Sequence, residues 1–170
     1  MKQHVILVGL PGSGKTTVGR RAAELLSAEF IDIDEIVESE TGRSITTIFA
    51  DSGEPGFRRL ERAAIQRALE GPARLIAAGG GWIMQPGNLE AARQKGACVL
   101  YLNTSPSLAA QRLRGDSSRP LLVGDRGARL RALLDAREAM YQGADLEVDA
   151  EGDVETVAAR VARLIQRDDS

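Results

Sequence analysis

The residues best suited to chemistry lie near the start of the chain, in the stretch Gly9-Leu10-Pro11-Gly12-Ser13-Gly14-Lys15-Thr16. This is the phosphate-loop pattern of glycine, four residues, glycine, lysine and a hydroxyl residue. Its glycines let the backbone approach a polyphosphate, with the N–H groups turned inward as a nest for anions. Lys15 would bring a positive charge to the β- and γ-phosphates, and the Thr16 hydroxyl would bind Mg²⁺. The pattern therefore predicts a site for a purine nucleoside triphosphate, against the alternative of a chance glycine-rich turn.

Two carboxylates, Asp32 and Asp34, close the second apolar run of the chain. Alternate residues of a strand face the same way, so we expect both acids on one side of it and Ile31 and Ile33 on the other. Ligands of parallel sheets bind beyond the carboxyl ends of the strands, which places these acids near the phosphate loop. Asp32 is then the candidate to position Mg²⁺, directly or through water. Asp34 could hydrogen-bond a substrate hydroxyl or accept its proton, or it could only cap the next helix.

Arg137 is a charged residue in an apolar position. The apolar stripe of its predicted helix consists of Leu130, Leu133, Leu134 and Tyr141. Spacings of three and four residues place Arg137 on the same stripe, and a buried guanidinium needs a carboxylate partner. That partner could be Asp34, Glu61 or a substrate carboxylate; alternatively, the side chain could extend to the protein edge.

Other candidate residues carry weaker signals. Arg58 and Glu61 share a helix face and could be an ordinary surface pair, since several arginines crowd this helix. The run 79–81 is all glycine, which would allow a close backbone approach to a ligand or simply form a tight turn. Arg119 lies in a polar loop and could deliver charge to a transferring phosphoryl group as part of a lid, or could be an ordinary solvated arginine.

The elements that must position these residues alternate along the chain. We predict strands at 5–8, 30–33, 75–78, 97–102 and 146–148. Helices are predicted at 16–27, 34–41, 44–49, from a turn at 53–56 to 68, 89–95, 108–113, 127–141 and from 154 onward. Such alternation predicts an α/β fold with a parallel sheet covered by helices on both faces. A length of 170 residues suits a single domain.

Composition excludes several classes of protein. The net charge of -2 gives no general electrostatic reason to bind nucleic acid or an anionic membrane, and the start of the chain contains no signal peptide or spanning segment. Cys98 lies in an apolar run and is expected to be a buried hydrophobe; one cysteine allows no internal disulfide, which suits the cytoplasm. The single histidine, His4, begins the first predicted strand and is expected to be structural or exposed, a position that allows no Ser/His/Asp arrangement. A monomer is expected, because no long exposed apolar stripe is present.

In combination the motifs resemble the shikimate kinase family, along nearly the whole chain. They are the phosphate loop, Asp32-Ile33-Asp34, Thr41-Gly42-Arg43-Ser44-Ile45, Gly53-Glu54 with Phe57-Arg58, Gly79-Gly80-Gly81, Arg119-Pro120-Leu121-Leu122, and Arg137 ahead of Tyr141. The resemblance implies a three-layer α/β/α P-loop kinase, like the nucleoside-monophosphate kinases, with a five-stranded parallel sheet of order 2-3-1-4-5. It implies Mg²⁺-dependent transfer of the ATP γ-phosphate to the 3-hydroxyl of shikimate, a step of chorismate and aromatic amino-acid biosynthesis.

The resemblance also implies roles for individual residues. Those expected to bind ATP are Gly12, Ser13, Gly14, Lys15, Thr16, Thr17, Arg112 (against adenine) and Arg119 (from the lid). Those expected to bind shikimate are Asp34 (ring hydroxyls), Arg58 and Arg137 (carboxylate), Gly80 (backbone) and Glu61 (orienting an arginine). Lys15, Asp34 and Arg119 are the implied catalytic residues, and Thr16 and Asp32 the implied metal site. A substrate-binding flap is implied at about 34–69 and a lid at about 114–126.

Two departures from the family pattern leave alternatives open. Trp82 stands where a small residue is usual, and could alter the pocket or pack behind it. The acidic stretch 149–153 lacks the expected arginine and proline, which bears on nucleotide affinity and base preference. The alternatives are a kinase for another hydroxy acid, such as gluconate, or a non-catalytic nucleotide-binding module. A nucleic-acid NTPase fits poorly, since a basic face is missing.

Overall fold

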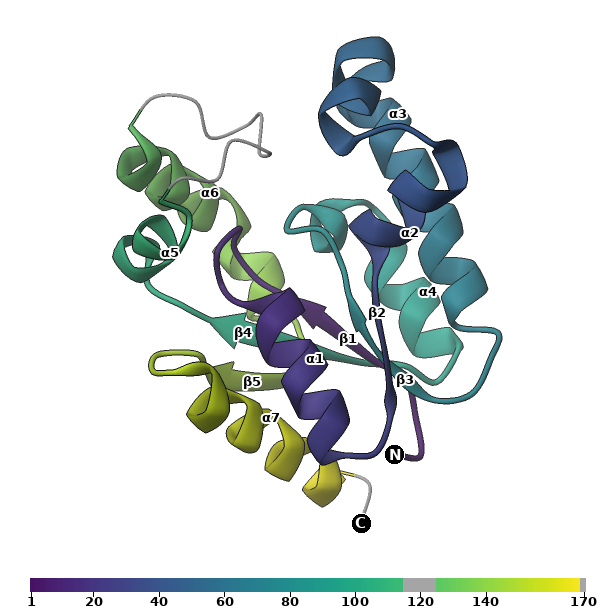
Figure 1. The fold of residues 1–170 in the computed structure, drawn as a ribbon, viewed down its shortest axis with the longest axis vertical. Helices are drawn as coiled ribbons and strands as arrows, with labels where there is room; N and C mark the ends of the chain where they lie inside the picture. The colour runs from purple at the N-terminus through teal and green to yellow at the C-terminus, as the bar shows by residue number, and fades with distance from the viewer. Residues whose placement is uncertain (115–124, 169–170) are drawn as a thin grey trace.

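The sheet is five-stranded and entirely parallel, in a computed structural model that describes residues 1–114 and 125–168 (Figure 1). Its strands are β1 (Val5–Val8), β2 (Glu29–Asp32), β3 (Arg74–Ala77), β4 (Cys98–Asn103) and β5 (Leu146–Asp149). Their order is β2-β3-β1-β4-β5, and every neighbouring pair is parallel because helical crossovers connect the strands. The predicted fold class and strand order are confirmed.

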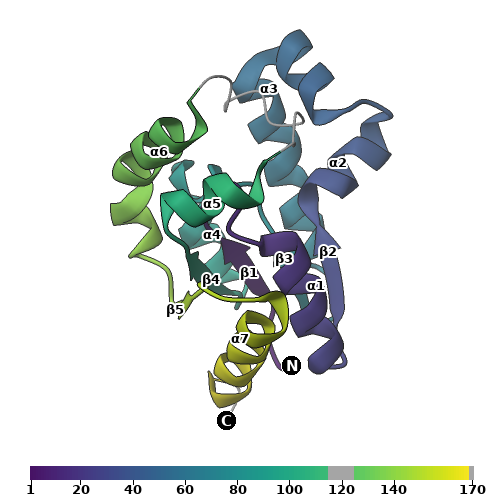
Figure 2. The same cartoon turned by 60° about the vertical axis from the view of Figure 1, so that its left-hand side comes forward.

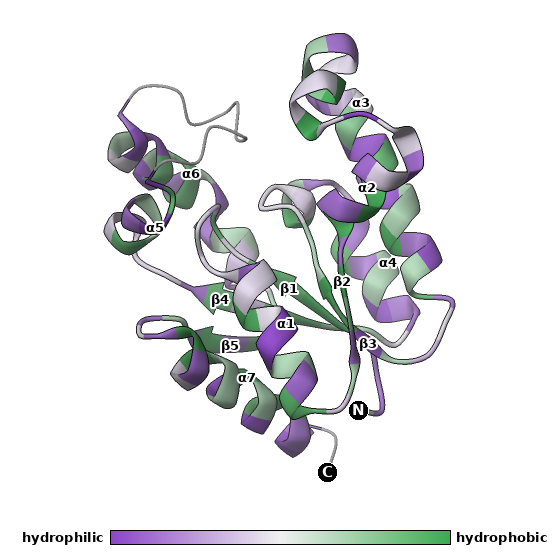
Figure 3. Cartoon of the chain, in the orientation of Figure 1, coloured by the Kyte–Doolittle hydropathy of each residue, from purple (hydrophilic) through white to green (hydrophobic). Residues whose placement is uncertain are grey.

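Helices cover both faces of the sheet. They are α1 (Lys15–Leu25), α2 (Ile33–Thr41), α3 (Ile45–Ala68), α4 (Asn88–Gln94), α5 (Pro106–Arg112), α6 (Arg126–Tyr141) and α7 (Val154–Asp168), with a short 3₁₀ helix, η1 (Trp82–Met84). Val5 and Leu7 of β1 face the core layer under α1 and α7, while Ile6 and Val8 face the layer under the remaining long helices. This alternation makes both faces of a central strand apolar, which produces three layers. Figure 2 shows α1 beside α7, and Figure 3 shows the sheet as the most hydrophobic part of the chain.

The start of α2 differs from the prediction. Strand β2 ends at Asp32, and Ile33 is already helical. Asp32 Oδ1 accepts a hydrogen bond of 2.9 Å from the Asp34 N–H, so Asp32 caps α2 and Asp34 lies in its first turn. The prediction that strand alternation places both acids on one side is therefore wrong, and so is the alternative that Asp34 is the cap.

The predicted turn at 53–56 is a kink within one helix. Only Gly53 departs from helical geometry, with φ 65° and ψ -177°, and Pro55 follows inside the next turn. Ser44 caps α3 and accepts a hydrogen bond from the Thr47 N–H at 3.1 Å, and Gly42 ends α2 with φ 64°. This kinked helix and α2 form one arm beside the carboxyl edge of the sheet, and α5 with α6 forms the other (Figures 1 and 2).

Within residues 1–114 and 125–168, none of the helices is long and apolar enough to cross a membrane. The same residues contain no cluster of three or more histidine, cysteine or acidic side chains that could hold a metal ion.

Candidate active site

The phosphate loop occupies the predicted place between β1 and α1. Gly12 and Gly14 have φ of 80° and 94°, a left-handed backbone that disfavours residues with a Cβ, and Gly14 is the N-cap of α1. A Cβ on Gly12 would lie 2.5 Å from the Ala109 carbonyl oxygen of α5, so this position also has no space for one. The loop therefore presents its N–H groups at the positive end of a helix, where anions bind.

Lys15 and Thr16 begin α1 and have defined partners. Lys15 is 8% exposed, and its Nζ donates to the carbonyl oxygens of Gly9 and Leu10 at 2.9 Å each. Thr16 Oγ1 donates to Asp32 Oδ2 at 2.5 Å. Because Oδ1 of the same carboxylate holds the Asp34 N–H, Asp32 joins the phosphate loop to the start of α2.

A cavity of about 310 Å³ opens over this loop. Its walls are formed by Gly12, Gly14, Lys15, Thr16, Thr17, Val18, Arg112 and Val154. Ser13, which was predicted among the ATP-binding residues, is fully buried beneath the loop. Arg112 donates to the Ser13 carbonyl at 3.3 Å and to the Ala150 and Gly152 carbonyls at 3.1 and 3.0 Å. It therefore ties the phosphate loop to the segment that connects β5 to α7.

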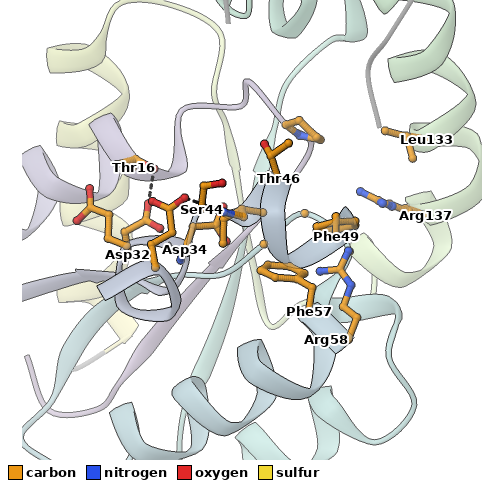
Figure 4. A pocket seen from close by; sticks show the side chains of 17 residues that line it. Thr16, Asp32, Asp34, Ser44, Thr46, Phe49, Phe57, Arg58, Leu133 and Arg137 are labelled. Atoms are coloured by element: carbon orange, nitrogen blue, oxygen red, sulfur yellow. Dashed lines mark hydrogen bonds between the residues drawn. The ribbon is translucent and has the colours of Figure 1, made fainter. Parts of the chain in front are cut away.

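A second cavity of about 320 Å³ lies beside the first (Figure 4). It is lined by Pro11, Thr16, Asp32, Asp34, Glu35, Glu38, Ser44, Ile45, Thr46, Phe49, Phe57, Arg58, Gly79, Gly80, Gly81, Leu133 and Arg137. Asp34 lies at one end with Thr16 and Asp32, and the guanidinium groups of Arg58 and Arg137 lie at the other. Thr16 lines both cavities, so they meet at the phosphate loop.

Arg58 and Glu61 form a buried ion pair rather than a surface pair. Arg58 Nη1 donates to Glu61 Oε2 at 2.7 Å, and its Nη2 donates to Glu54 at 3.0 Å. Glu61 is fully buried, and its other oxygen accepts from the Gly79 N–H at 2.9 Å. Burial raises the pKa of Glu61, and the positive charge of Arg58 opposes that shift. Glu61 lines neither cavity; it lies behind Arg58 and fixes its direction.

Arg137 faces inward on α6, as its position on the apolar stripe predicted. It is buried, lines the second cavity and lies against Gly80 and Gly81. Of the partners left open by the sequence, Glu61 is paired with Arg58 instead. The arrangement places a second guanidinium in the cavity, where it can meet a ligand carboxylate.

The triple glycine is required by the side chains around it. A Cβ on Gly79 would lie 2.2 Å from Glu61 Oε1, and one on Gly81 would lie 2.3 Å from Arg58 Nη2. A Cβ on Gly80 would lie 3.1 Å from Arg137 Nη1. The loop is thus a backbone ridge packed between charged groups, in contact with both arginines of the cavity.

Both departures from the family pattern lie outside the second cavity. Trp82 is 2% exposed and packs in the core, so it lies behind the pocket. The carboxylates of the acidic stretch hold their own loop: Glu151 accepts from the Ser105 N–H, and Asp153 accepts from the Thr156 N–H at the start of α7, both at 2.9 Å.

The sequence analysis did not identify all of the residues that line the second cavity. The missed lining includes Phe49, whose ring lies 5.0 Å from that of Phe57, and the acids Glu35 and Glu38. Phe49 also packs against the main core, and Glu35 and Glu38 are exposed helix acids, so the sequence pattern does not distinguish any of them from ordinary core or surface residues. Arg119 and nearly all of the predicted lid lie outside the described residues.

A phosphate loop whose cavity meets a second one, with two arginines and an acid, defines a P-loop kinase for a small anionic substrate. A model of the shikimate kinase family matches residues 11–166. The shikimate kinase of Stenotrophomonas maltophilia strain K279a is 42% identical over 164 residues, covering 95% of this chain and 89% of that one. That of Symbiobacterium thermophilum is 46% identical over 141 residues, covering 81% and 80%. The chain belongs to the shikimate kinase family.

Solved structures agree with this assignment. The shikimate kinase from Acinetobacter baumannii in complex with shikimate has a TM-score of 0.91 and 38% identity, over 98% of this chain and 94% of that one. A gluconokinase from Sinorhizobium meliloti 1021, with a TM-score of 0.58 and 18% identity over 99% and 98% of the chains, shares the fold alone. The predicted family, fold and kinase class are confirmed.

Proposed function

We propose that this chain transfers the γ-phosphate of ATP to the 3-hydroxyl of shikimate. The observation that carries the proposal is the second cavity, in which Asp34 lies at one end and Arg58 and Arg137 lie at the other. Two guanidinium groups suit one carboxylate, an acid suits hydroxyl groups, and the shared residue Thr16 brings the phosphates close.

At the nucleotide end, backbone groups of Gly12, Ser13, Gly14 and Thr17 hold the phosphates, and Arg112 borders adenine. Lys15 exchanges the carbonyls of Gly9 and Leu10 for phosphate oxygens. The Thr16 hydroxyl and the Asp32 carboxylate, 2.5 Å apart, are hard oxygen donors of the kind Mg²⁺ prefers. Bound there, Mg²⁺ would supply positive charge to the β- and γ-phosphates.

At the substrate end, Arg58 and Arg137 bind the carboxylate, and the Gly80 backbone contacts the ring. Glu61 holds Arg58 in direction through its 2.7 Å ion pair. Asp34 orients the reacting hydroxyl and accepts its proton as the phosphoryl group arrives. Arg119, from the predicted lid, would complete the charge around that group. A lid that excludes water would favour transfer to shikimate over hydrolysis of ATP.

The proposal extends to the domain organisation, the localisation and the oligomeric state of the protein. We infer one domain with a flap at about 34–69 and a lid at about 114–126, acting as a cytoplasmic monomer on ATP and shikimate. In support of a monomer, the large exposed hydrophobic residues of the described part are scattered: Leu25, Met140 and Val154.

The test is ADP release from Mg²⁺-ATP with shikimate, gluconate, quinate or no acceptor. We expect turnover to rise by orders of magnitude with shikimate alone. Equal background turnover with all four, from a protein that still binds ATP, would reject the substrate and leave the phosphate loop as a binding module. Preferential turnover of gluconate would favour the other hydroxy-acid kinase.

A further inference from the structure

The last turn of α6 carries Tyr141, a fully buried tyrosine that lines neither cavity yet contacts two groups of the substrate site. Its hydroxyl donates to the Gly80 carbonyl oxygen at 2.7 Å. The Arg137 guanidinium, one helical turn earlier, lies close enough to the same hydroxyl to favour a lower pKa for it. A hydroxyl has one donor and two acceptor positions, so it can donate to the carbonyl and accept from the guanidinium at once.

The ring of Tyr141 is held in place by a second tyrosine. Tyr101 of β4 stacks on it with the ring centroids 4.8 Å apart and the planes at 8°. The Tyr101 hydroxyl, in contrast, reaches Asn103 at 3.4 Å and not the glycine loop. Stacking therefore fixes the position of the Tyr141 hydroxyl against the sheet, and only that hydroxyl reaches the substrate site.

The hydroxyl also keeps its proton. Burial raises the pKa of Tyr141, and the neighbouring charge of Arg137 opposes the rise. A protonated hydroxyl is needed to donate to the Gly80 carbonyl, and that bond turns the Gly80 peptide in one direction. Without this hydrogen bond the Gly80 peptide would be less constrained, because glycines have no side chains that could hold the loop by packing.

We propose that Tyr141 is a positioning residue, which orients Arg137 and the Gly80 peptide for the substrate carboxylate. This inference rests on the proposed function, because it concerns the same substrate site. Arg58 is oriented by Glu61 and Arg137 by Tyr141, so each guanidinium of the cavity has its own buried support. Because the support of Arg137 is neutral, it does not offset the positive charge that Arg137 offers to a carboxylate.

The test compares Tyr141→Phe with Tyr101→Phe, which remove one hydroxyl each from the same stacked pair. Losing the buried hydroxyl that orients Arg137 and the Gly80 peptide should raise the KM for shikimate about ten-fold in Tyr141→Phe, with kcat and the KM for ATP within about two-fold of wild type. Tyr101→Phe should leave all three constants within about two-fold. Shikimate affinity can be measured separately through the fluorescence of Trp82, the single tryptophan, which directly follows the glycine loop.

A second acceptor distinguishes positioning from a general loss of structure. For the neutral carboxamide of shikimate, the advantage of the carboxylate over the amide should shrink in Tyr141→Phe, because Arg137 is no longer oriented. An unchanged KM for shikimate, equal losses with acid and amide, or parallel losses in kcat and the KM for ATP with a lowered melting temperature would each overturn the inference. Failure of the proposed function looks different, since wild type itself would then not turn over shikimate.

Discussion

Asp34 and Glu61 are both acids near the substrate cavity, yet their surroundings give them different chemistry. Asp34 lines the cavity, where its carboxylate can meet a hydroxyl. Glu61 is removed from solvent and committed to Arg58 and the Gly79 N–H, so it can position but cannot touch the substrate. Substitutions of the two should therefore be distinguishable by what they change.

Asp34→Asn should lower kcat by about 10²–10⁴-fold, because an amide cannot accept the proton of the reacting hydroxyl. ATP affinity should stay within about two-fold, since Asp34 does not line the nucleotide cavity. Steady-state kinetics with equilibrium nucleotide binding measures both. Unchanged turnover would remove Asp34 from the chemistry.

Glu61→Gln should destabilise the fold by about 3–5 kcal/mol and raise the KM for shikimate, because Arg58 loses its buried partner and keeps only the partly exposed Glu54. Glu54→Gln is the matched control: Glu54 pairs with the same arginine, but its side chain is 47% exposed. It should cost about 0–1 kcal/mol. Urea unfolding of both variants measures the difference, and equal costs would contradict the burial argument.

At the scale of elements, the site is assembled where three connections leave the sheet. The phosphate loop follows β1, the first turn of α2 with Asp34 follows β2, and the glycine ridge follows β3; these strands are neighbours in the order β2-β3-β1. The arms, α2 with α3 and α5 with α6, then bring Arg58 and Arg137 over that edge (Figure 1). Precision at the edge thus depends on how closely the glycine ridge packs between the arms.

Gly79→Ala should test that packing. Its new Cβ would lie 2.2 Å from Glu61 Oε1, so the buried acid must shift and take Arg58 with it. We expect a KM for shikimate raised at least ten-fold and a loss of about 1–3 kcal/mol from overpacking. The control is Gly127→Ala in α6, where the nearest atom is 3.5 Å away. It should be neutral or stabilising by about 0.5–1 kcal/mol, as measured by thermal unfolding.

The sequence predicted the elements well and their junctions poorly, for local reasons. The spacing of Arg137 with Tyr141 was enough to place that arginine inward, because helix periodicity is rigid. The end of β2 was misplaced by about one residue, since an Asp32 side chain that caps α2 outweighs strand alternation. The three-residue spacing of Arg58 and Glu61 predicted that the two could pair. Their burial depends on the glycine ridge, which comes from a distant part of the chain and could not be predicted from that spacing.

At the scale of the whole molecule, the amino edge of the sheet carries a titratable group of its own, on the side opposite to both cavities. The single histidine, His4, precedes β1 at the amino edge, buried and away from both cavities. Burial lowers its pKa below 6.5, and the charge of Arg74 adds to the effect. Its neutral form is therefore the one that folding favours.

The sign of the pH effect follows from that lowered pKa. Below pH 6.5 the unfolded chain binds a proton at His4 before the folded chain does, so stability present above this pH falls as the solution is acidified. His4→Gln should make the free energy of unfolding less dependent on pH between 7.5 and the folded-state pKa. Urea titrations at several pH values measure this slope, and a slope identical to wild type would exclude His4 as its source.

One carboxylate oxygen of Asp32 accepts a hydrogen bond from the Thr16 hydroxyl, and the other accepts one from the Asp34 N–H. This carboxylate therefore connects Thr16, which lines both cavities, with Asp34, which lines the second. Thermodynamic linkage is symmetric, so the coupling free energy between the Mg²⁺-ATP site and the acceptor site is the same in both directions. The factor by which the nucleotide changes acceptor affinity then equals the factor by which the acceptor changes nucleotide affinity, whichever of the two binds first.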